Sequence, residues 1–183
     1  MTTPAASGDF AFTPLRETDL PMLMEWHARA HVARWWDPAP GSLDELRADF
    51  LSGATGIEAF IVWLKGRPIG FVQVYVVRDA GGGWWPDETD PGARGIDQFL
   101  ANEEDLGRGM GGAMVRSLLA RLFADPAVTK VQTDPAPDNA RAIRACEKAG
   151  FTRVGVVDTP DGTAMLMVCA RGEFEGEGRV PRS

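Results

Sequence analysis

Residues 96–119 read IDQFLANEEDLGRGMGGAMVRSLL and combine a carboxylate with a glycine-dense turn. Asp97 interrupts an apolar stretch, where a carboxylate is costly unless it is paired or used in chemistry. It is therefore either a general base or the ion-pair partner of an arginine such as Arg94. Residues 107–112 are mostly glycine, so their backbone N–H groups can converge where the following helix supplies positive partial charge. The spacing predicts a loop that binds phosphate or pyrophosphate.

The glycine-dense turn matches neither of the two commonest nucleotide-binding loops. It lacks the Lys-Ser/Thr ending of a Walker loop, and no acidic ribose-binding residue follows a second strand at Rossmann spacing. A flexible connection capped by glycine is the alternative interpretation. The neighbouring segments of the sequence help to distinguish a phosphate-binding loop from a flexible connection.

The segments that must position these residues show strand and helix patterns in turn. Period-two alternation and turn residues predict strands at residues 10–16, 57–64, 69–77, 94–101, 127–133, 151–157 and 164–170. Apolar spacing and capping residues predict helices at 18–32, at 42–51, from the glycine-dense turn to about 123, and at 139–149. The intervening loop at 78–92 is long, and such loops inside a compact domain usually carry function.

The length and composition of the chain indicate the general class of protein. The chain has 183 residues, 44% of them hydrophobic and 25% charged, which is ordinary for a soluble globular domain. We predict a disordered tail at residues 1–9, a single domain at 10–172 and a flexible tail at 173–183. No apolar run could span a bilayer and no secretory pattern opens the chain, so a cytoplasmic protein is expected. The apolar content gives no strong dimer signal, which favours a monomer or weak homodimer.

The net charge and the few metal-ligating residues limit the kinds of ligand and partner that the chain could bind. The formal net charge is −7, which makes nucleic acid a poor partner and a cationic small molecule a favourable one. Solubility alone is the other explanation of this charge, but the acids gather in loops. Two cysteines without Cys-x-x-Cys spacing predict no disulfide framework. His27 and His31 lie four residues apart without a third ligand, so no metal is expected.

A second motif lies in the last third of the chain. Residues 133–139 read TDPAPDN and lead into ARAIRACEKAGF. An asparagine at a helix start, then a helix ending in Ala-Gly-Phe, resembles the last αβ unit of the GNAT superfamily of N-acetyltransferases. The glycine-dense turn is similar to that family's Gln/Arg-x-x-Gly-x-Gly/Ala pattern, with Leu106 in the first position. The resemblance implies an α/β (α+β) fold: a mixed, mostly antiparallel central sheet, splayed between its two middle parallel strands and flanked by helices.

Loop motifs narrow this resemblance further. Trp-Trp at 84–85, Thr-Asp-Pro-Gly at 89–92, Arg-Gly-Ile-Asp-Gln at 94–98, Thr-Asp-Pro at 133–135 and Thr-Pro-Asp-Gly at 159–162 occur in this order. As a set they resemble the aminoglycoside 6′-N-acetyltransferases over nearly the whole chain, from residue 12 to 171. The resemblance implies transfer of the acetyl group of acetyl-CoA to the 6′-amine of an aminoglycoside. It also implies direct attack in a ternary complex, with antibiotic resistance as the outcome.

The resemblance assigns roles to individual residues. It makes Asp97 the base that takes the proton of the attacking amine. The positions implied to bind acetyl-CoA are Phe99, Leu106, Gly107, Arg108, Gly109, Met110, Gly111, Gly112 and Asn139. The positions implied to bind the aminoglycoside are Trp36, Gln73, Trp85, Asp97, Asp134 and Asp161. Ordinary structural roles are the alternative for several of them: core packing for Trp36, a cross-strand hydrogen bond for Gln73, and turn capping for Asp134 and Asp161.

Two positions depart from the family pattern. The family has an aspartate two residues before the tryptophan pair, where this chain has Gly82; Asp79 or Asp87 could supply the carboxylate instead. Cys146 occupies the position at which acetyltransferases of this fold often have a tyrosine near the CoA sulfur. Its thiol could protonate the leaving thiolate as a general acid, or it could simply be a small packing residue.

Two other functions are open at this point. The same fold and co-substrate could serve another small amine, such as a polyamine, an amino sugar or a siderophore precursor. A non-catalytic module that binds acetyl-CoA is the third interpretation, although Asp97 and the acidic loops would then have no purpose.

Overall fold

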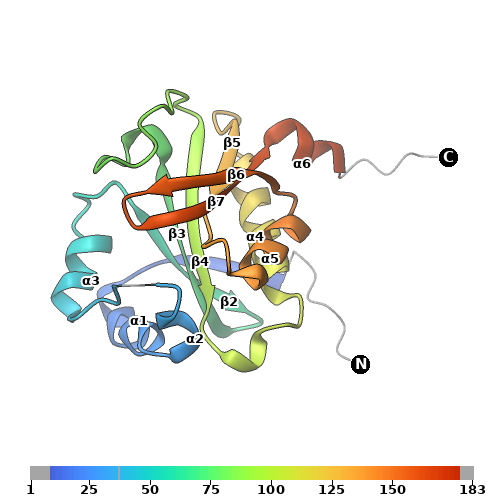
Figure 1. The fold of residues 1–183 in the computed structure, drawn as a ribbon. Helices are drawn as coiled ribbons and strands as arrows, with labels where there is room; N and C mark the ends of the chain where they lie inside the picture. The colour runs from blue at the N-terminus through green and yellow to red at the C-terminus, as the bar shows by residue number, and fades with distance from the viewer. Residues whose placement is uncertain (1–8, 37, 178–183) are drawn as a thin grey trace.

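The computed structural model describes residues 9–36 and 38–177, and all strands in this part of the chain belong to one seven-stranded sheet (Figure 1). The strands are β1 (Phe10–Pro14), β2 (Glu58–Leu64), β3 (Arg67–Val76), β4 (Ala93–Leu100), β5 (Lys130–Thr133), β6 (Thr152–Thr159) and β7 (Gly162–Ala170). The α-helices are α1 (Leu20–His27), α2 (Ala30–Ala33), α3 (Leu43–Phe50), α4 (Met110–Phe123), α5 (Ala140–Ala149) and α6 (Arg171–Glu177). Short 3₁₀ turns are η2 (Glu17–Asp19), η3 (Val77–Asp79) and η4 (Glu103–Asp105).

The sheet is antiparallel except at its middle. Its order is β1-β2-β3-β4-β5-β7-β6, and β4 and β5 are the parallel pair. Their ladder joins Ala93 to Lys130 and ends where Gly95 meets Gln132, although β4 continues to Leu100. The two strands therefore separate beyond Gly95. This confirms the predicted mixed sheet that splays between its two middle strands.

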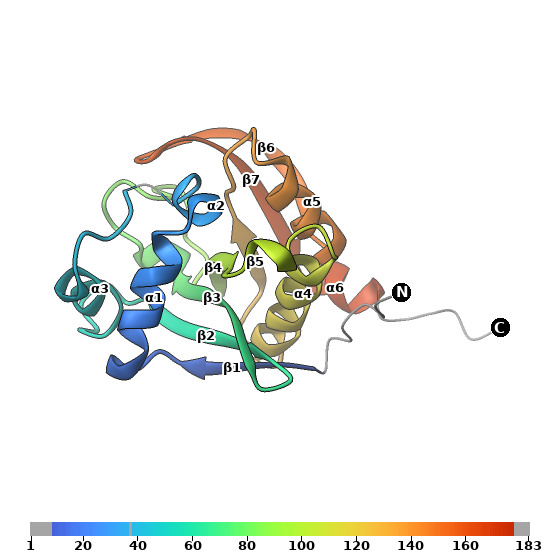
Figure 2. The same cartoon turned by 90° about the horizontal axis from the view of Figure 1, so that it is seen from below.

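Alternating residues of the strands build a separate core on each face of the sheet. On β2, Phe60 and Val62 pack in the cluster that includes α4 and α5, whereas Ala59 and Ile61 pack in the cluster that includes α1 and α3. Figure 2 shows α1–α3 on one side of the sheet and α4 with α5 on the other. Helices cover both faces of the sheet. The separation of β4 and β5 therefore offers a place where a ligand can reach the middle of the sheet.

The predicted helix at 18–32 is two helices. Arg29 has extended backbone (φ −70°, ψ 131°) and separates α1 from α2. Its guanidinium donates hydrogen bonds to the carbonyl oxygen of Ala101 (2.8 Å) and to Oδ1 of Asn102 (2.6 Å). The break thus ties the N-terminal helices to the turn that follows β4.

The first residues of the predicted C-terminal tail at 173–183 are helical, because α6 continues to Glu177. Arg171 anchors this helix through hydrogen bonds from its guanidinium to the carbonyl oxygens of Phe123 and Val128 (each 2.8 Å). Residues 178–183 lie outside the described residues. Of the predicted tail at 1–9, only Asp9 is described, and its carboxylate lies 3.6 Å from Nζ of Lys65. The division into one domain with two tails otherwise stays a prediction.

The sheet ends at β6, and this outer strand is irregular. Its pairing with β7 shifts register between Arg153 and Gly155, which leaves Val154 as an extra residue. Val154 and Val156 are exposed. Among the described residues, no helix is long and apolar enough to cross a membrane.

Candidate active site

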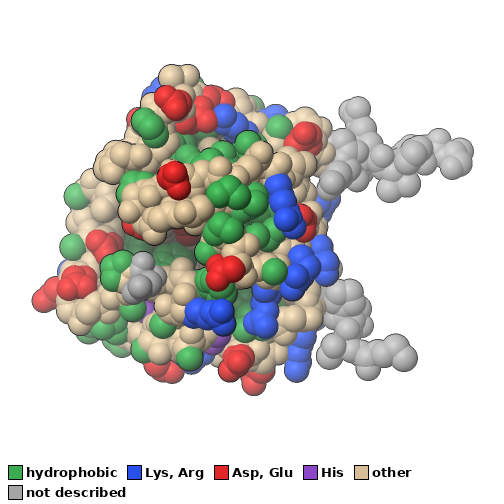
Figure 3. All heavy atoms as spheres, viewed as in Figure 1, with side chains coloured by type: hydrophobic (Ala, Val, Ile, Leu, Met, Phe, Trp, Pro, Cys, Tyr) green, Lys and Arg blue, Asp and Glu red, His purple; other side chains and the backbone are tan. Residues whose placement is uncertain are grey.

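A cavity of about 1310 Å³ lies where β4 and β5 separate. Its wall draws on β3, β4, the end of β5, the starts of α4 and α5, and the turn between β6 and β7. Figure 3 shows this face of the molecule hollowed, with most of its Lys and Arg side chains on the α5 side. The cavity is large enough for two ligands of moderate size.

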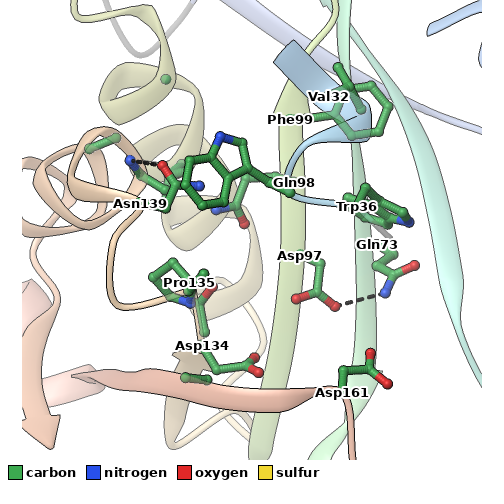
Figure 4. Close-up of a pocket in the computed structure, with 18 of the residues that line it drawn as sticks. Val32, Trp36, Gln73, Asp97, Gln98, Phe99, Asp134, Pro135, Asn139 and Asp161 are labelled. Carbon is green, nitrogen blue, oxygen red and sulfur yellow. Dashed lines mark hydrogen bonds between the residues drawn. The ribbon is translucent and has the colours of Figure 1, made fainter. Parts of the chain in front are cut away.

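Asp97 lies on β4 in the wall of this cavity. It is paired in register with Gln73 of β3, whose Nε2 donates a hydrogen bond of 2.7 Å to Oδ2 of Asp97 (Figure 4). Burial raises the pKa of Asp97; the hydrogen bond from Gln73 opposes the rise, and the charge of Asp161 adds to it. The guanidinium of Arg94 instead donates to the carbonyl oxygen of Pro91 at 2.8 Å. The ion-pair role for Asp97 is therefore wrong, and a carboxylate with raised basicity faces the cavity.

Two further carboxylates face the same space. Asp134 directly follows β5, and Asp161 lies in the turn between β6 and β7. Figure 4 shows both around the part of the cavity that Asp97 borders. Burial raises the pKa of Asp134 to about 7, and the negative charges of Asp97 and Asp161 contribute to the rise. This acidic wall, Asp97 with Asp134 and Asp161, is complementary to a ligand with several ammonium groups.

The glycine loop, residues 107–112, borders the cavity from the other side. Gly107 and Gly109 have φ of 73° and 80°, a region that is strained for other residues. Gly109 is the N-cap of α4, so the unpaired N–H groups of the first turn of the helix lie directly after it. Leu106, Gly107, Gly109, Gly111 and Gly112 line the cavity.

The turn before the glycine loop is held by buried charge. Arg67 of β3 donates two hydrogen bonds of 2.9 Å to the carboxylate of Asp105. Burial by itself would raise the pKa of Asp105, but the bonds from Arg67 and Asn102 hold it below its usual value. The loop is therefore fixed to the sheet before it reaches α4.

Helix α5 packs directly on the first turn of α4. A Cβ at Gly112 would lie 3.1 Å from the carbonyl oxygen of Ala145, and one at Gly111 would lie 3.6 Å from Cβ of Ala145. Asn139 caps α5 by accepting a hydrogen bond from the N–H of Ala142 (3.1 Å), and it also lines the cavity. The glycines thus let two helix starts meet at one cavity, which suits a phosphorylated ligand.

Residues 16–159 match the family model of the acetyltransferase (GNAT) domain. The chain belongs to the GNAT acetyltransferase family. The aminoglycoside N(6′)-acetyltransferase type 1 of Klebsiella pneumoniae is 50% identical over 166 residues, 88% of this chain and 83% of that protein. A kanamycin resistance protein of Rhizobium radiobacter is 62% identical over 94 residues, 51% of this chain and 87% of that protein. These matches confirm the resemblance that the loop motifs indicated.

A solved structure agrees with the fold over nearly its full length. AAC(6′)-Ib in complex with parmomycin and acetyl-CoA is similar with a TM-score of 0.90 and 47% sequence identity. The similarity covers 95% of this chain and 99% of that chain. In the described part of this acetyltransferase, no group of three or more His, Cys, Asp or Glu side chains could hold a metal ion.

Aromatic side chains form another part of the cavity wall in this acetyltransferase. Trp36 and Phe99 line the cavity with ring centroids 5.3 Å apart, and both contact the buried ring of His27. Burial lowers the pKa of His27 to about 4, so this imidazole is neutral. Trp36 therefore does more than pack in a core: one side of it contacts the core and the other faces the cavity.

The tryptophan loop differs from the sequence prediction. Trp84 lines the cavity, whereas Trp85 lies outside its wall, beside the hydroxyl of Tyr75. The φ of Trp85 is 48°, in the left-handed region, which directs the two neighbouring indoles to different places. Trp84 is thus the indole of this pair that lines the cavity, and a contact of Trp85 with the substrate stays a prediction. Of the two acids considered as replacements at Gly82, Asp79 lines the cavity and Asp87 is exposed outside its wall.

Tyr75 is a cavity residue that the predicted site omitted. It is opposite Gly95 in the β3–β4 register, and a Cβ at Gly95 would lie 2.1 Å from Cζ of the tyrosine ring. Burial raises the pKa of Tyr75, and the charges of Asp97 and Asp134 raise it further. The signal available in the sequence was its position on the same face of the strand as Gln73.

Three predicted residues lie away from the cavity wall. Arg108 is exposed, and Met110 packs against the core around α4. Cys146 is fully buried in that core, where it accepts a weak hydrogen bond of 3.9 Å from Nε2 of Gln98. Burial raises the pKa of the Cys146 thiol to about 12. Its environment is that of a packing residue and not of a general acid in contact with substrate.

Proposed function

We propose that this enzyme transfers the acetyl group of acetyl-CoA to the 6′-amine of aminoglycosides. The observation that carries the proposal is one cavity bordered by the acidic wall on one side and the glycine loop on the other. Carboxylates suit a polycationic acceptor, and helix N-termini suit the pyrophosphate of the donor. The relatives named for aminoglycoside acetylation and kanamycin resistance support this choice of acceptor.

Asp97 is proposed as the general base. An aliphatic amine is mostly protonated near neutral pH, and its nitrogen attacks only after it loses that proton to the carboxylate, directly or through water. The neutral nitrogen then forms a bond to the thioester carbonyl carbon, the C–S bond breaks, and CoA leaves as a thiolate. The nitrogen loses its second proton as the amide forms, and this proton passes to the thiolate, directly or through water, to give CoA thiol. The hydrogen bond from Gln73 fixes the direction in which the carboxylate points. The raised pKa of Asp97 strengthens it as a base.

The remaining cavity residues are proposed to orient the acceptor. Asp134 and Asp161 would hold other ammonium groups, and Asp79 would supply the carboxylate that is missing at Gly82. Trp36 and Trp84 present flat indole surfaces on which sugar rings can stack. Attack within a ternary complex requires donor and acceptor to share one space, and the cavity provides it.

The decisive measurement is the release of CoA thiol from acetyl-CoA with kanamycin, with spermidine and lysine as control amines. We expect turnover with kanamycin and little with either control amine. NMR of the product should then show the acetyl group on the 6′ nitrogen. Turnover with spermidine alone would contradict the aminoglycoside assignment and leave the acetyltransferase class intact. Binding of acetyl-CoA without turnover on any amine would favour the non-catalytic module.

The predicted location, oligomeric state and macromolecular partners of the enzyme do not follow from its chemistry. A cytoplasmic location, a monomer or weak homodimer, and the lack of nucleic-acid and membrane partners stay predictions. Size-exclusion chromatography with light scattering measures the oligomeric state, and expression in a susceptible strain with kanamycin selection measures resistance.

A further inference from the structure

One amide side chain connects the N-terminal helices with the turn before the glycine loop. Asn102 lies in that turn, is half-buried, and lies outside the wall of the large cavity. Its Oδ1 accepts a hydrogen bond of 2.6 Å from the guanidinium of Arg29, and its Nδ2 donates one of 3.2 Å to Oδ2 of Asp105. Arg67 of β3 donates two hydrogen bonds of 2.9 Å to the same carboxylate. We call Arg29, Asn102, Asp105 and Arg67 the polar bridge.

The two ends of the polar bridge lead to different parts of the cavity wall. Arg29 begins the segment that contributes His31 and Trp36 to the wall. Asp105 lies shortly before the glycine loop, which borders the cavity elsewhere. His31 also fixes α2 to β4, since its Nε2 lies 3.1 Å from the carbonyl oxygen of Leu100, but this contact stops short of the turn. The polar bridge therefore joins the aromatic part of the wall to the glycine loop.

The middle position of the polar bridge requires a side chain with both an acceptor and a donor. A guanidinium only donates hydrogen bonds, and an ionised carboxylate only accepts them. Burial opposes ionisation of Asp105, but the bonds from Arg67 and Asn102 hold its pKa below the usual value. The amide oxygen of Asn102 must therefore face Arg29 and its nitrogen must face Asp105. A carboxylate of the same size could satisfy Arg29 but not Asp105.

We propose that Asn102 is a positioning residue, which sets the placement of the thioester relative to the attacking amine. This inference rests on the proposed acetyl transfer. The glycine loop binds pyrophosphate through its own backbone, and the acidic wall binds the acceptor, so each site stays intact when the polar bridge is cut. What changes is the separation of the reacting atoms, and a displacement of about 1 Å can lower the rate by about 10²-fold. Asn102 therefore acts on kcat and leaves both binding steps unchanged.

Asn102→Asp tests this role because it cuts the polar bridge at one point. The variant keeps the size of the side chain and its contact with Arg29, but it places a second carboxylate against Asp105. Steady-state release of CoA thiol with kanamycin measures kcat and the KM of each substrate. We expect kcat to fall by at least about tenfold, with both KM values within about threefold of wild type.

The double variant N102D/D105N exchanges the amide and the carboxylate and should restore the link. The new carboxylate accepts from Arg29, and the new amide donates to that carboxylate while its oxygen accepts from Arg67. We expect kcat to return to within about threefold of wild type. Stability in urea should nevertheless fall below that of Asn102→Asp, because the buried ion pair between Arg67 and Asp105 is lost. Recovery of kcat in a less stable protein separates positioning from a merely structural role.

Glu103→Gln is the matched control, since Glu103 is an exposed acid in the same turn but outside the polar bridge. It should keep wild-type kinetics. A near-normal kcat in Asn102→Asp would overturn the proposal, as would a loss of kcat that N102D/D105N deepens. A raised KM for acetyl-CoA at unchanged kcat would overturn it too, by placing Asn102 in co-substrate binding; the proposed function would stand in all three cases. Absence of turnover with kanamycin in the wild-type protein would overturn both.

Discussion

The acidic wall and the glycine loop border one cavity but are built in opposite ways. The three carboxylates of the wall come from β4, from the end of β5 and from the β6–β7 turn, and the sheet brings them together. The glycine loop is six consecutive residues, and the positive φ angles of Gly107 and Gly109 shape its backbone. The wall therefore depends entirely on tertiary structure, whereas the loop depends on local backbone conformation as well.

The two regions also carry different costs. Burial raises the pKa values of Asp97 and Asp134, and neighbouring negative charges add to the rise, so ionisation of these two carboxylates lowers the stability of the protein. The glycine loop has no such charge conflict, but its positive φ angles exclude other residues. Substitutions should therefore affect chemistry and pH dependence in the wall, and donor binding in the loop.

The largest effect is expected from Asp97→Asn, which keeps the shape of the wall and removes its base. Loss of a general base lowers kcat by about 10²–10⁴-fold, and we expect a fall in that range for kanamycin acetylation. CoA affinity measured by calorimetry should not change. Asp87→Asn, which makes the same change of charge at an exposed acid outside the cavity, should have near-normal kcat. A kcat within threefold of wild type, roughly 0.6 kcal/mol, would show that Asp97 is not the base.

The next largest effect is expected from Gly109→Ala in the glycine loop. Gly109 and Gly66 both have φ of 80°, and a Cβ at either position would meet no atom within 4 Å. An alanine there is strained by roughly 1–2 kcal/mol. We expect Gly109→Ala to raise the KM for acetyl-CoA by about tenfold with little change in the acceptor KM. Gly66→Ala should reduce stability without changing either KM; equal KM values in both variants would remove the proposed role of the loop.

A smaller effect, on stability, is expected from Asp134→Asn. The unfolded carboxyl titrates near its model value of 3.8, and the folded one at about 7. Between these pH values the folded state holds the extra proton, so the free energy of unfolding falls as pH rises through this window. The variant lacks that fall, and at about pH 8 it should be more stable by roughly 1–2 kcal/mol. Urea denaturation at several pH values measures this, and a gain that does not shrink toward pH 4 would show that ionisation of Asp134 is not its cause.

The smallest effect is expected from Cys146→Ala. Because the thiol is buried in the core and CoA thiolate is a good leaving group, the variant should keep most of its kcat. Steady-state kinetics with kanamycin checks this. A hundredfold loss of kcat, with CoA affinity unchanged, would make the thiol a general acid after all.

The comparison between wall and loop also explains what the sequence could predict. The glycine loop and the two cap residues are local features: Ser42 accepts from the N–H of Glu45 at 3.2 Å, and Asn139 accepts from that of Ala142. Residue type and spacing are enough to recognise such contacts. Alternation and turn residues also predicted the seven strands. The splay between the two middle strands was predicted only from the family resemblance.

Features that depend on tertiary contacts were harder to predict. Spacing could not tell which of Trp84 and Trp85 lines the cavity; in the structure Trp84 does, and Trp85 has left-handed backbone. Helix α6 was missed because a guanidinium bound to distant carbonyl groups, and not its own propensity, holds it in place.

The irregular outer strand β6 has a consequence for the behaviour of the enzyme at high concentration. Exposed valines on the edge of a sheet are a common template for edge-to-edge association with another chain. In β6 the extra residue Val154 interrupts the regular ladder between Arg153 and Gly155. A bulge of this kind increases local twist and breaks the row of evenly spaced N–H and C=O groups that an incoming strand would need. We therefore expect the bulge to disfavour edge-to-edge association at the edge where Val154 and Val156 are exposed.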